Sequence, residues 1–529
     1  MQKTAKIRKL AHNGVLVPAY GPQGFAIGYD GRKIKLTPDQ EEMAVSWARK
    51  LGTDYVKDPV FARNFARDFS KALGLEKEAR MDDFDFSRIT QWLEKEKTRK
   101  EKMPREEKRA LAEAREKIRE TNREKYGYAV LNGEKVEIAN YMVEPPSIFM
   151  GRGKHPLRGR WKPSVEYEDI TLNLSEDAPT PKLPAGRKWS GRVFDPTALW
   201  VARWRDKLAD KMKYVWISET ARPRQEREME KFNTALKLQD RIEDVRRYIL
   251  QNLNSKDMLR RKVATVAYLI DALKLRVGDE KEKDEADTVG ATTLRGAHVK
   301  INSGGKVNFD FLGKDSVRWT KTVELPPQVV HNLKSLIKGP RDMIFNGVRS
   351  NLVNSFLNEA MPGLTAKVFR TYHATKIVSD YLSQNNVSPS DPEIKKKFVA
   401  TSANLRAAIA CNHKRKLPKS WESSMEKKTM RLKSLEEKLR ELRDMPKTMA
   451  RLKRMKRLRA EIKSAKLKLE MASMTKNYNL VTSLKSYIDP RVYAIWAKKN
   501  SYDWKQVYPK SLQRKLLWVE EDFGKCQSD

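Results

Sequence analysis

The sequence predicts an α+β fold, because strand patterns and helix patterns occupy separate stretches of the chain. Short strand patterns broken by turn residues fill residues 127–200, amphipathic helices dominate from about 230 to 410, and a basic pair of helices follows at 417–475. The 529 residues exceed the size of a single small scaffold and suffice for roughly three or four compact units. We therefore expect several domains with separate cores.

The first 90 residues are predicted to form a mixed α+β unit. The turn Tyr29–Arg32 contains Asp-Gly and is flanked by Ile27 and Ile34, which favours a hairpin. Thr37-Pro38 is a typical helix start, so a helix is expected over Thr37–Leu51. The stretch Glu94–Lys125 is almost wholly charged, which predicts exposed helices.

One β-hairpin interrupts the helical region. Residues 307–311 and 317–319 alternate apolar and polar side chains on either side of a turn that contains Gly313. This pattern predicts a hairpin with Lys314 at its tip.

Two helices of this region carry basic side chains. The predicted helix Val263–Leu275 has one apolar stripe and delivers Arg276 at its end. In Leu364–Leu382, apolar residues fall on one side while Lys367, Arg370 and His373 recur every three residues on another. Both helices should pack inward along their apolar stripes.

Residues 417–475 are predicted to form an antiparallel helical hairpin. They hold 18 Lys and Arg against 8 Asp and Glu, a local net charge of +10, and Pro446 separates two apolar seams. The seam residues are Leu432, Leu435, Leu439 and Leu442 in the first helix and Leu452, Met455, Leu458, Ile462, Ala465 and Leu469 in the second.

The charge of the whole chain points to a polyanionic partner. The formal net charge is +39, yet 39% of residues are hydrophobic, so the chain folds and is not a basic tail. Cys411 and Cys526 are the sole cysteines, and no zinc-type spacing of Cys and His occurs. The segment Gly304–Val307 lacks the residues of a nucleotide-binding loop. We expect a reducing compartment, no metal, no ATP and no membrane segment.

Five successive motifs carry a resemblance to a known family. They are LKLRVGDEKEKDEADTVGATTLR (273–295), FDFLGKDSVRW (309–319), LTAKVFRTYHA (364–374), AIACNHKRKLPKSWE (408–422) and LKSYIDPRVYAIWAKK (484–499). Together with HNGVLVPAY, YDGRKIKLTPDQEE and EPPSIFMGRGKHP nearer the start, they resemble the eukaryotic-type DNA topoisomerase I, or type IB, family in the family's own order.

The resemblance implies a two-lobed DNA clamp. Its mixed α/β cap and DNA-binding lobe would be residues 1–215, including the charged helices near 90–125. A mainly helical catalytic core, similar to that of tyrosine recombinases, would be residues 216–416. An antiparallel coiled-coil linker (417–475) and a C-terminal domain (476–529) would follow.

The implied reaction is relaxation of supercoiled duplex DNA without ATP or metal. Tyr487 would attack a backbone phosphate and become joined to the 3′ end. Arg276 and Arg370 would hold the non-bridging oxygens, His413 would donate to the same oxygens, and Lys314 would protonate the departing 5′ oxygen. These five residues are the predicted catalytic set, and no cofactor is expected.

The resemblance also implies contacts that are directed mainly to the DNA backbone, so little sequence preference is expected. The predicted DNA-binding residues are Arg152, Lys154, His155, Lys213, Tyr214, Lys231, Lys281, Thr288, Asp315, Thr365, Ala366, Lys367 and Ser486.

Two features depart from the family pattern. Ser486 stands before the nucleophile, where many members have Asn, which bears on camptothecin-type poisons and not on catalysis. The chain begins almost at the cap, without the long tail of nuclear members. We therefore expect a compact archaeal or prokaryotic monomer, cytoplasmic and associated with the nucleoid, with the nucleus as the alternative for a eukaryotic source.

Two alternatives use the same features differently. A tyrosine recombinase has a related Arg, Lys, His and Tyr set, but it assembles as a tetramer at specific sites. An architectural DNA-coating protein would explain the charge but not the motifs. Relaxation of a plasmid in chelator without ATP separates all three.

Overall fold

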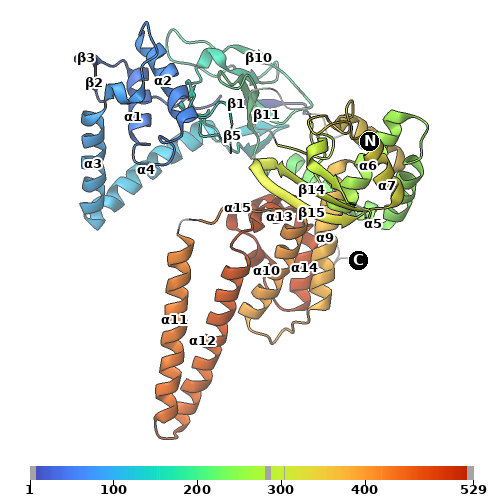
Figure 1. Ribbon diagram of the computed structural model, residues 1–529. Helices are drawn as coiled ribbons and strands as arrows, with labels where there is room; N and C mark the ends of the chain where they lie inside the picture. The colour runs from blue at the N-terminus through green and yellow to red at the C-terminus, as the bar shows by residue number, and fades with distance from the viewer. Residues whose placement is uncertain are drawn as a thin grey trace. The chain divides into compact units, whose positions relative to one another are not determined.

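The computed structural model describes residues 7–520 except 152, 154, 280–287, 303 and 419. The chain divides into two compact units, one that runs to Arg224 and one that begins at Gln225 (Figure 1). Each unit has hydrophobic clusters of its own. The α+β prediction is confirmed at this level, because the chain combines many helices with small, largely antiparallel sheets.

The described residues of the N-terminal unit form four small sheets with strand orders β1-β5-β6, β3-β2-β4, β10-β9-β11-β12 and β7-β8. Their bounds are β1 (Leu10–His12), β2 (Ala26–Tyr29), β3 (Arg32–Lys35), β4 (Phe84–Asp85), β5 (Tyr128–Leu131), β6 (Glu134–Glu137), β7 (Ser147–Ile148), β8 (Trp161–Lys162), β9 (Thr171–Asn173), β10 (Gly191–Val193), β11 (Trp200–Arg205) and β12 (Met212–Trp216).

The hairpin predicted near Tyr29 is the β2–β3 hairpin. Tyr29 pairs with Arg32 across it, and Asp30 and Gly31 adopt positive φ angles of 49° and 68°. These left-handed conformations are those that an Asp-Gly turn supplies. The predicted turn is therefore confirmed.

The helices of the same unit are α1 (Pro38–Ala48), α2 (Pro59–Leu73), α3 (Ser87–Lys102) and α4 (Arg105–Tyr126). Thr37 caps α1 in a capping box with Gln40, so the helix begins as predicted, but it ends at Ala48 and not at Leu51. The described helix α4 buries no side chain, which confirms the exposed charged helices.

The C-terminal unit is mainly helical. Its helices are α5 (Arg222–Asn252), α6 (Met258–Leu273), α7 (Pro327–Leu336), α8 (Ser350–Ala360), α9 (Ala366–Gln384), α10 (Glu393–Ala410), α11 (Trp421–Asp444), α12 (Met449–Met474), α13 (Leu480–Ser486), α14 (Pro490–Lys499) and α15 (Lys510–Gln513). One hydrophobic core is formed by helices α5, α6, α7, α8 and α9 and a small sheet. A second core is formed by α9, α10, α13 and α14. Helix α9 belongs to both cores.

The small sheet of this unit contains the predicted hairpin. Strands β14 (Lys306–Gly313) and β15 (Val317–Glu324) pair antiparallel, and a third strand, β13 (Val299–Ile301), extends the sheet on the β14 side. The short 3₁₀ turn η4 (Lys314–Ser316) joins the two long strands. Lys314 therefore lies at the tip, as predicted.

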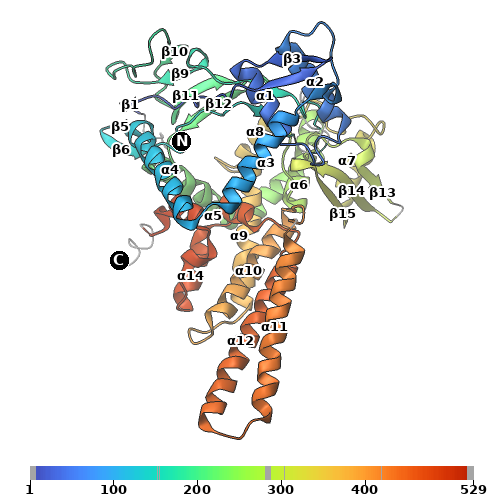
Figure 2. The same cartoon turned by 90° about the vertical axis from the view of Figure 1, so that its left-hand side faces the viewer.

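Helices α11 and α12 lie side by side in both views (Figure 1 and Figure 2). Leu442, Met455, Leu458 and Ile462 form their buried contact. Leu452 was predicted to belong to this contact, but it is 54% exposed. It lies in the first turn of α12, next to the connection at Pro446, where the first helix has already ended.

Among the described residues, no helix combines the length and the apolar character needed to cross a membrane.

Candidate active site

Tyr487 lies directly after α13, and its side chain is buried. Its backbone N–H donates to the Ser483 carbonyl at 2.9 Å, which closes the helix. Thr375 of α9 donates through Oγ1 to the Tyr487 carbonyl at 3.2 Å and accepts from the Asp489 N–H at 3.0 Å. Hydrogen bonds on both sides of the residue therefore fix the backbone that carries the phenol.

Arg276 lies in a segment without regular secondary structure, three residues beyond the end of α6. Its carbonyl accepts from the Ala291 N–H at 2.9 Å, and the Val277 carbonyl accepts from the Thr292 N–H at 2.9 Å. The segments around Gly278 and Gly290 approach so closely that a Cβ on Gly290 would lie 2.5 Å from the Gly278 Cα. Glycine is required there for steric reasons.

This anchored segment directs Arg276 at the tyrosine. Arg276 Nη1 donates to the Tyr487 hydroxyl at 2.8 Å. A guanidinium group is permanently charged and can only donate, so this contact is compatible with negative charge on the phenolic oxygen.

Arg370 lies on α9 and is 4% exposed. Its Nη1 donates to the Lys274 carbonyl at 2.5 Å and its Nη2 to the Cys411 carbonyl at 3.0 Å. The guanidinium carbon lies 4.8 Å from the centroid of the Tyr487 ring. Among the described residues, Arg370 Nε is buried and has no hydrogen-bond partner.

His413 follows α10 in a Schellman turn. Asn412 adopts a left-handed conformation with φ 54°, its N–H donates to the Ile409 carbonyl, and the His413 N–H donates to the Ala408 carbonyl. The turn stacks the imidazole on the Tyr487 ring, with centroids 5.3 Å apart.

The imidazole has a polar partner on each side. Nε2 lies 3.2 Å from Arg370 Nη2, and Nδ1 lies 2.7 Å from Ser483 Oγ. Burial, Arg370 and Arg276 lower the pKa of His413 to about 3. Burial disfavours the charged form of the imidazole, and the two positively charged arginines repel it. The imidazole is therefore neutral at physiological pH.

Lys314 is exposed at the hairpin tip and lines the same cavity as Arg276, Arg370 and His413. Stacking of Phe311 on Trp319, with centroids 5.2 Å apart, supports the hairpin behind it. The ammonium group of Lys314, the two guanidinium groups and the imidazole therefore all line one cavity.

The chemistry of this set suits attack on a phosphodiester. A buried phenol is surrounded by two permanently charged donors and a neutral imidazole, with a lysine at the cavity wall. Cationic donors that are fixed in advance stabilise the charge of a phosphoryl transition state. In the described part of the chain, no group of three His, Cys, Asp or Glu is placed to hold a metal ion.

Some predicted DNA-binding residues lie in the same unit. Thr365 precedes α9, Ala366 is buried, and Lys367 is exposed in the first turn, one turn before Arg370. Lys231 on α5 is largely buried and paired with Glu228, and burial lowers its pKa to about 8.

Three further predictions concern the edges of this site. Ser486 is the last residue of α13, beside the tyrosine, and Thr288 is half-buried. Asp315 belongs to η4, although its side chain lies outside the described part of the structure.

Other predicted DNA-binding residues belong to the N-terminal unit. The His155 ring packs edge-on against Phe149, with centroids 4.9 Å apart. Lys213 pairs with Glu144 at 3.5 Å, and Tyr214 is exposed on strand β12. The remaining predicted residues, Arg152, Lys154 and Lys281, lie outside the described residues.

Sequence reasoning missed three residues that shape the site, namely Ser483, Thr375 and Asn412. A local signal existed for Asn412, because Asn after a helix commonly adopts the left-handed conformation. Ser483 and Thr375 act through partners 70 and 112 positions away, so no local pattern identifies them.

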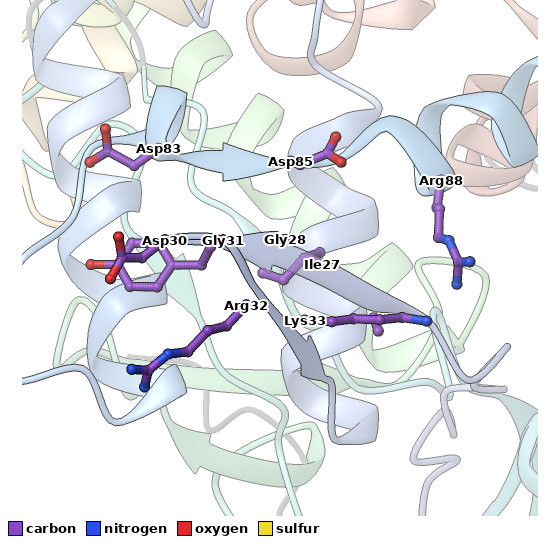
Figure 3. A pocket seen from close by; sticks show the side chains of 11 residues that line it. Ile27, Gly28, Asp30, Gly31, Arg32, Lys33, Asp83, Asp85 and Arg88 are labelled. Carbon is purple, nitrogen blue, oxygen red and sulfur yellow. The ribbon is translucent and has the colours of Figure 1, made fainter.

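A separate cavity in the N-terminal unit lies over the β2–β3 hairpin (Figure 3). Asp83 and Asp85 line one side of it, with Arg32 and Lys33 opposite. Asp85 already accepts from the Ser87 N–H at 2.8 Å. Opposite charges balance in this cavity, and its lining residues include no histidine or cysteine.

Three family models match the chain. The eukaryotic DNA topoisomerase I DNA-binding fragment matches residues 5–217, its catalytic core matches 220–446, and a C-terminal topoisomerase domain matches 459–525.

Relatives with known names agree with these matches. The chain is 37% identical over 553 residues to DNA topoisomerase 1 beta of Arabidopsis thaliana, which covers 99% of this chain and 60% of that protein. It is 39% identical over 438 residues to DNA topoisomerase 1 of Candidozyma auris, and the match covers 80% of this chain and 58% of that protein. The chain therefore spans little more than half the length of these two relatives. It is 33% identical over 554 residues to DNA topoisomerase 1 of Homo sapiens, covering 98% and 72%. The chain belongs to the eukaryotic DNA topoisomerase I family.

Proposed function

We propose that this chain relaxes supercoiled duplex DNA by cutting one strand, letting the helix turn about the intact strand, and resealing the cut. The observation that carries the proposal is the 2.8 Å contact between Arg276 and the Tyr487 hydroxyl, beside Arg370 and His413, which both contact the tyrosine ring. Family membership supports the same reaction.

In the cleavage step the Tyr487 oxygen forms a bond to phosphorus, and the bond from phosphorus to the 5′ oxygen breaks. The phenolic proton is released to water, and Lys314 gives a proton to the departing 5′ oxygen. Arg276 and Arg370 bind the non-bridging oxygens, and His413 donates to one of them. Each role fits the donor type, because charged forked donors match phosphoryl oxygens and an alkoxide leaving group requires a proton.

Resealing is the reverse of cleavage. The 5′ hydroxyl gives its proton to Lys314 and attacks the phosphotyrosine, the bond from phosphorus to the Tyr487 oxygen breaks, and that oxygen regains a proton from water. One phosphodiester is exchanged for another, so the reaction needs neither ATP nor a metal ion.

The proposed domain roles follow the resemblance. Residues 1–215 form the cap lobe of a clamp around the duplex, and 216–416 form the catalytic core. Residues 417–475 form a coiled-coil linker that slows rotation of the DNA electrostatically, and 476–529 carry the nucleophile. The net charge of +39 supports a clamp that contacts the DNA backbone with little sequence preference. The enzyme works as a monomer.

A nuclear location is supported over the nucleoid by the sources of the relatives. The plant, yeast and human proteins reported above all come from eukaryotes. Fractionation of cells that express the tagged chain tests this location.

Plasmid relaxation by the full chain in EDTA without ATP tests the reaction. The wild type should remove supercoils and, when stopped with detergent, should carry a Tyr487 peptide joined to a 3′ phosphate. Tyr487→Phe should bind the plasmid as tightly as the wild type but form no adduct. Adduct formation by that variant, or an adduct on another residue, overturns the proposal.

Tyr502→Phe is a matched control. Tyr502 is also buried in the C-terminal unit, and among the described residues its hydroxyl has no hydrogen-bond partner. This variant should relax plasmids at the wild-type rate. A coating protein would leave the linking number unchanged in every sample, and a recombinase would act only at defined sites.

A further inference from the structure

Ser483 of α13 contacts both His413 and the backbone of the nucleophile. Its side chain is fully buried, and its Oγ lies 2.7 Å from His413 Nδ1. Its carbonyl accepts from the Tyr487 N–H at 2.9 Å and from the Ile488 N–H at 3.1 Å. The side chain and the main chain of one residue therefore serve two parts of the site.

The partners of the imidazole fix its protonation. Arg370 Nη2 lies 3.2 Å from His413 Nε2, and a guanidinium group has no acceptor, so Nε2 must accept. A neutral imidazole that accepts at Nε2 carries its proton on Nδ1. In the DNA-free protein, Nδ1–H therefore donates to Ser483 Oγ.

The proposed reaction requires the opposite arrangement. To donate to a phosphoryl oxygen, His413 needs its proton on Nε2, and the neutral ring then accepts at Nδ1. Ser483 can support both forms, because a hydroxyl has one donor and two acceptor positions. Alanine or valine at this position supports neither form.

We propose that Ser483 is a positioning residue that acts through His413 by reversing its hydrogen bond when a phosphodiester enters the site. Nε2 takes a proton from water that enters the cavity, Nδ1 gives its proton back to that water, and both the ring and the water end neutral. The serine hydroxyl then donates to Nδ1 and holds the new tautomer. This inference rests on the proposed function only for the DNA-bound state.

Nitrogen-15 NMR of the full chain with labelled histidine tests the tautomer without requiring activity. The His413 signals are identified by their loss in His413→Gln. In the DNA-free wild type, Nδ1 should be protonated and Nε2 bare. In Tyr487→Phe bound to a short duplex, Nε2 should become the protonated nitrogen. Protonation at Nε2 before DNA is added, or no change after it, overturns the proposal.

Single-turnover cleavage of a short duplex tests the role in the reaction. Ser483→Ala should cleave about 10- to 100-fold more slowly, as is typical when the partner that fixes a histidine tautomer is lost. The dissociation constant for the duplex should stay within about twofold of wild type, since the hydroxyl faces His413 and not the DNA. The carbonyl that holds Tyr487 is unchanged in this variant, so a slower step reports on the hydroxyl.

A matched pair and a double variant separate positioning from packing. Ser483→Thr keeps the hydroxyl and should recover most of the rate, whereas Ser483→Val has the same shape without the hydroxyl and should stay slow. In a His413→Ala background, Ser483→Ala should have no further effect. Equal rates for Thr and Val, or a further loss in that background, overturn the proposal. If the wild type leaves DNA uncut, the proposed function fails, while the DNA-free tautomer still decides whether Ser483 accepts from His413.

Discussion

Arg276 and Tyr487 lie 211 positions apart in the sequence, yet Arg276 Nη1 is 2.8 Å from the Tyr487 hydroxyl. The arginine is anchored by Ala291 through its own backbone, and the tyrosine is anchored by Ser483 and Thr375. Both side chains therefore extend from hydrogen-bonded backbone. The contact between them forms in the DNA-free chain.

Replacement of Arg276 should slow cleavage more than it weakens binding. We expect Arg276→Ala to lower the single-turnover rate about 10²- to 10³-fold, the usual loss for one donor to a transition-state oxygen. Arg276→Lys should recover little, because a lysine ammonium lacks the forked geometry of guanidinium. Duplex affinity should fall only slightly in both variants. Equal losses in rate and affinity would contradict this assignment.

The close approach of Gly278 and Gly290 predicts a steric lesion. In Gly290→Ala the new Cβ would lie 2.5 Å from the Gly278 Cα, so the backbone must shift, which costs about 1–3 kcal/mol of stability. The midpoint temperature of thermal unfolding should fall. The single-turnover cleavage rate should fall too, because the shifted segment carries Arg276. Gly304→Ala is the control, since its Cβ would have nothing within 4 Å.

The role of Lys314 predicts a dependence on the leaving group. Lys314→Ala should slow cleavage of an ordinary duplex by at least about 10²-fold. With sulfur in place of the departing 5′ oxygen, the variant should approach the wild-type rate, because a thiolate leaves without a proton. A loss of the same size on both substrates would show that Lys314 is not the acid.

The buried imidazole of His413 predicts a pH-dependent stability. Its pKa is lowered from 6.5 to about 3, so between these values the unfolded chain binds a proton that the folded chain does not. Stability therefore falls as the pH drops through this window, by about 2 kcal/mol between pH 6.5 and pH 5. The unfolding midpoint should drop less between pH 7 and pH 5 in His413→Gln than in the wild type. The pKa of His12 is also lowered, but His12 is present in both proteins, so its contribution to the drop is the same in each. Identical drops would contradict burial of a neutral ring.

Helix α12 contains one buried and one exposed leucine that can be compared. Leu458 is 8% exposed and Leu452 is 54% exposed. Leu458→Ala should therefore destabilise the pair of helices, by about 2 kcal/mol, whereas Leu452→Ala should have almost no effect. Hydrogen exchange of the α11 and α12 amides measures both. Equal loss of protection would mean that the helices do not pack through this seam.

Local patterns predicted the elements that are formed by neighbouring residues. The Asp-Gly turn, the capping box at Thr37 and the hairpin tip at Lys314 all depend on residues a few positions apart. The strand β13 was missed, because only three residues pair along it and their pattern is too short to recognise. Leu452 was misplaced because periodicity alone does not show where the partner helix ends.

The site could not be assembled from local patterns. Arg276 was expected at a helix end, but it lies in an irregular segment that contacts residues 290–292. The network of Ser483 and His413 joins segments that approach each other only in the folded chain. The catalytic residues were named from resemblance, and their roles stay predictions.

The two backbone carbonyls that hold Arg370, those of Lys274 and Cys411, have a thermodynamic consequence. A side chain that is already immobilised loses no further rotational entropy when an anion arrives. In the proposed reaction, the two carbonyls would hold the guanidinium group in place while the strand turns, so the broken ends would meet an unchanged electrostatic environment when they return. Rejoining would then begin without a delay for reassembly of the site.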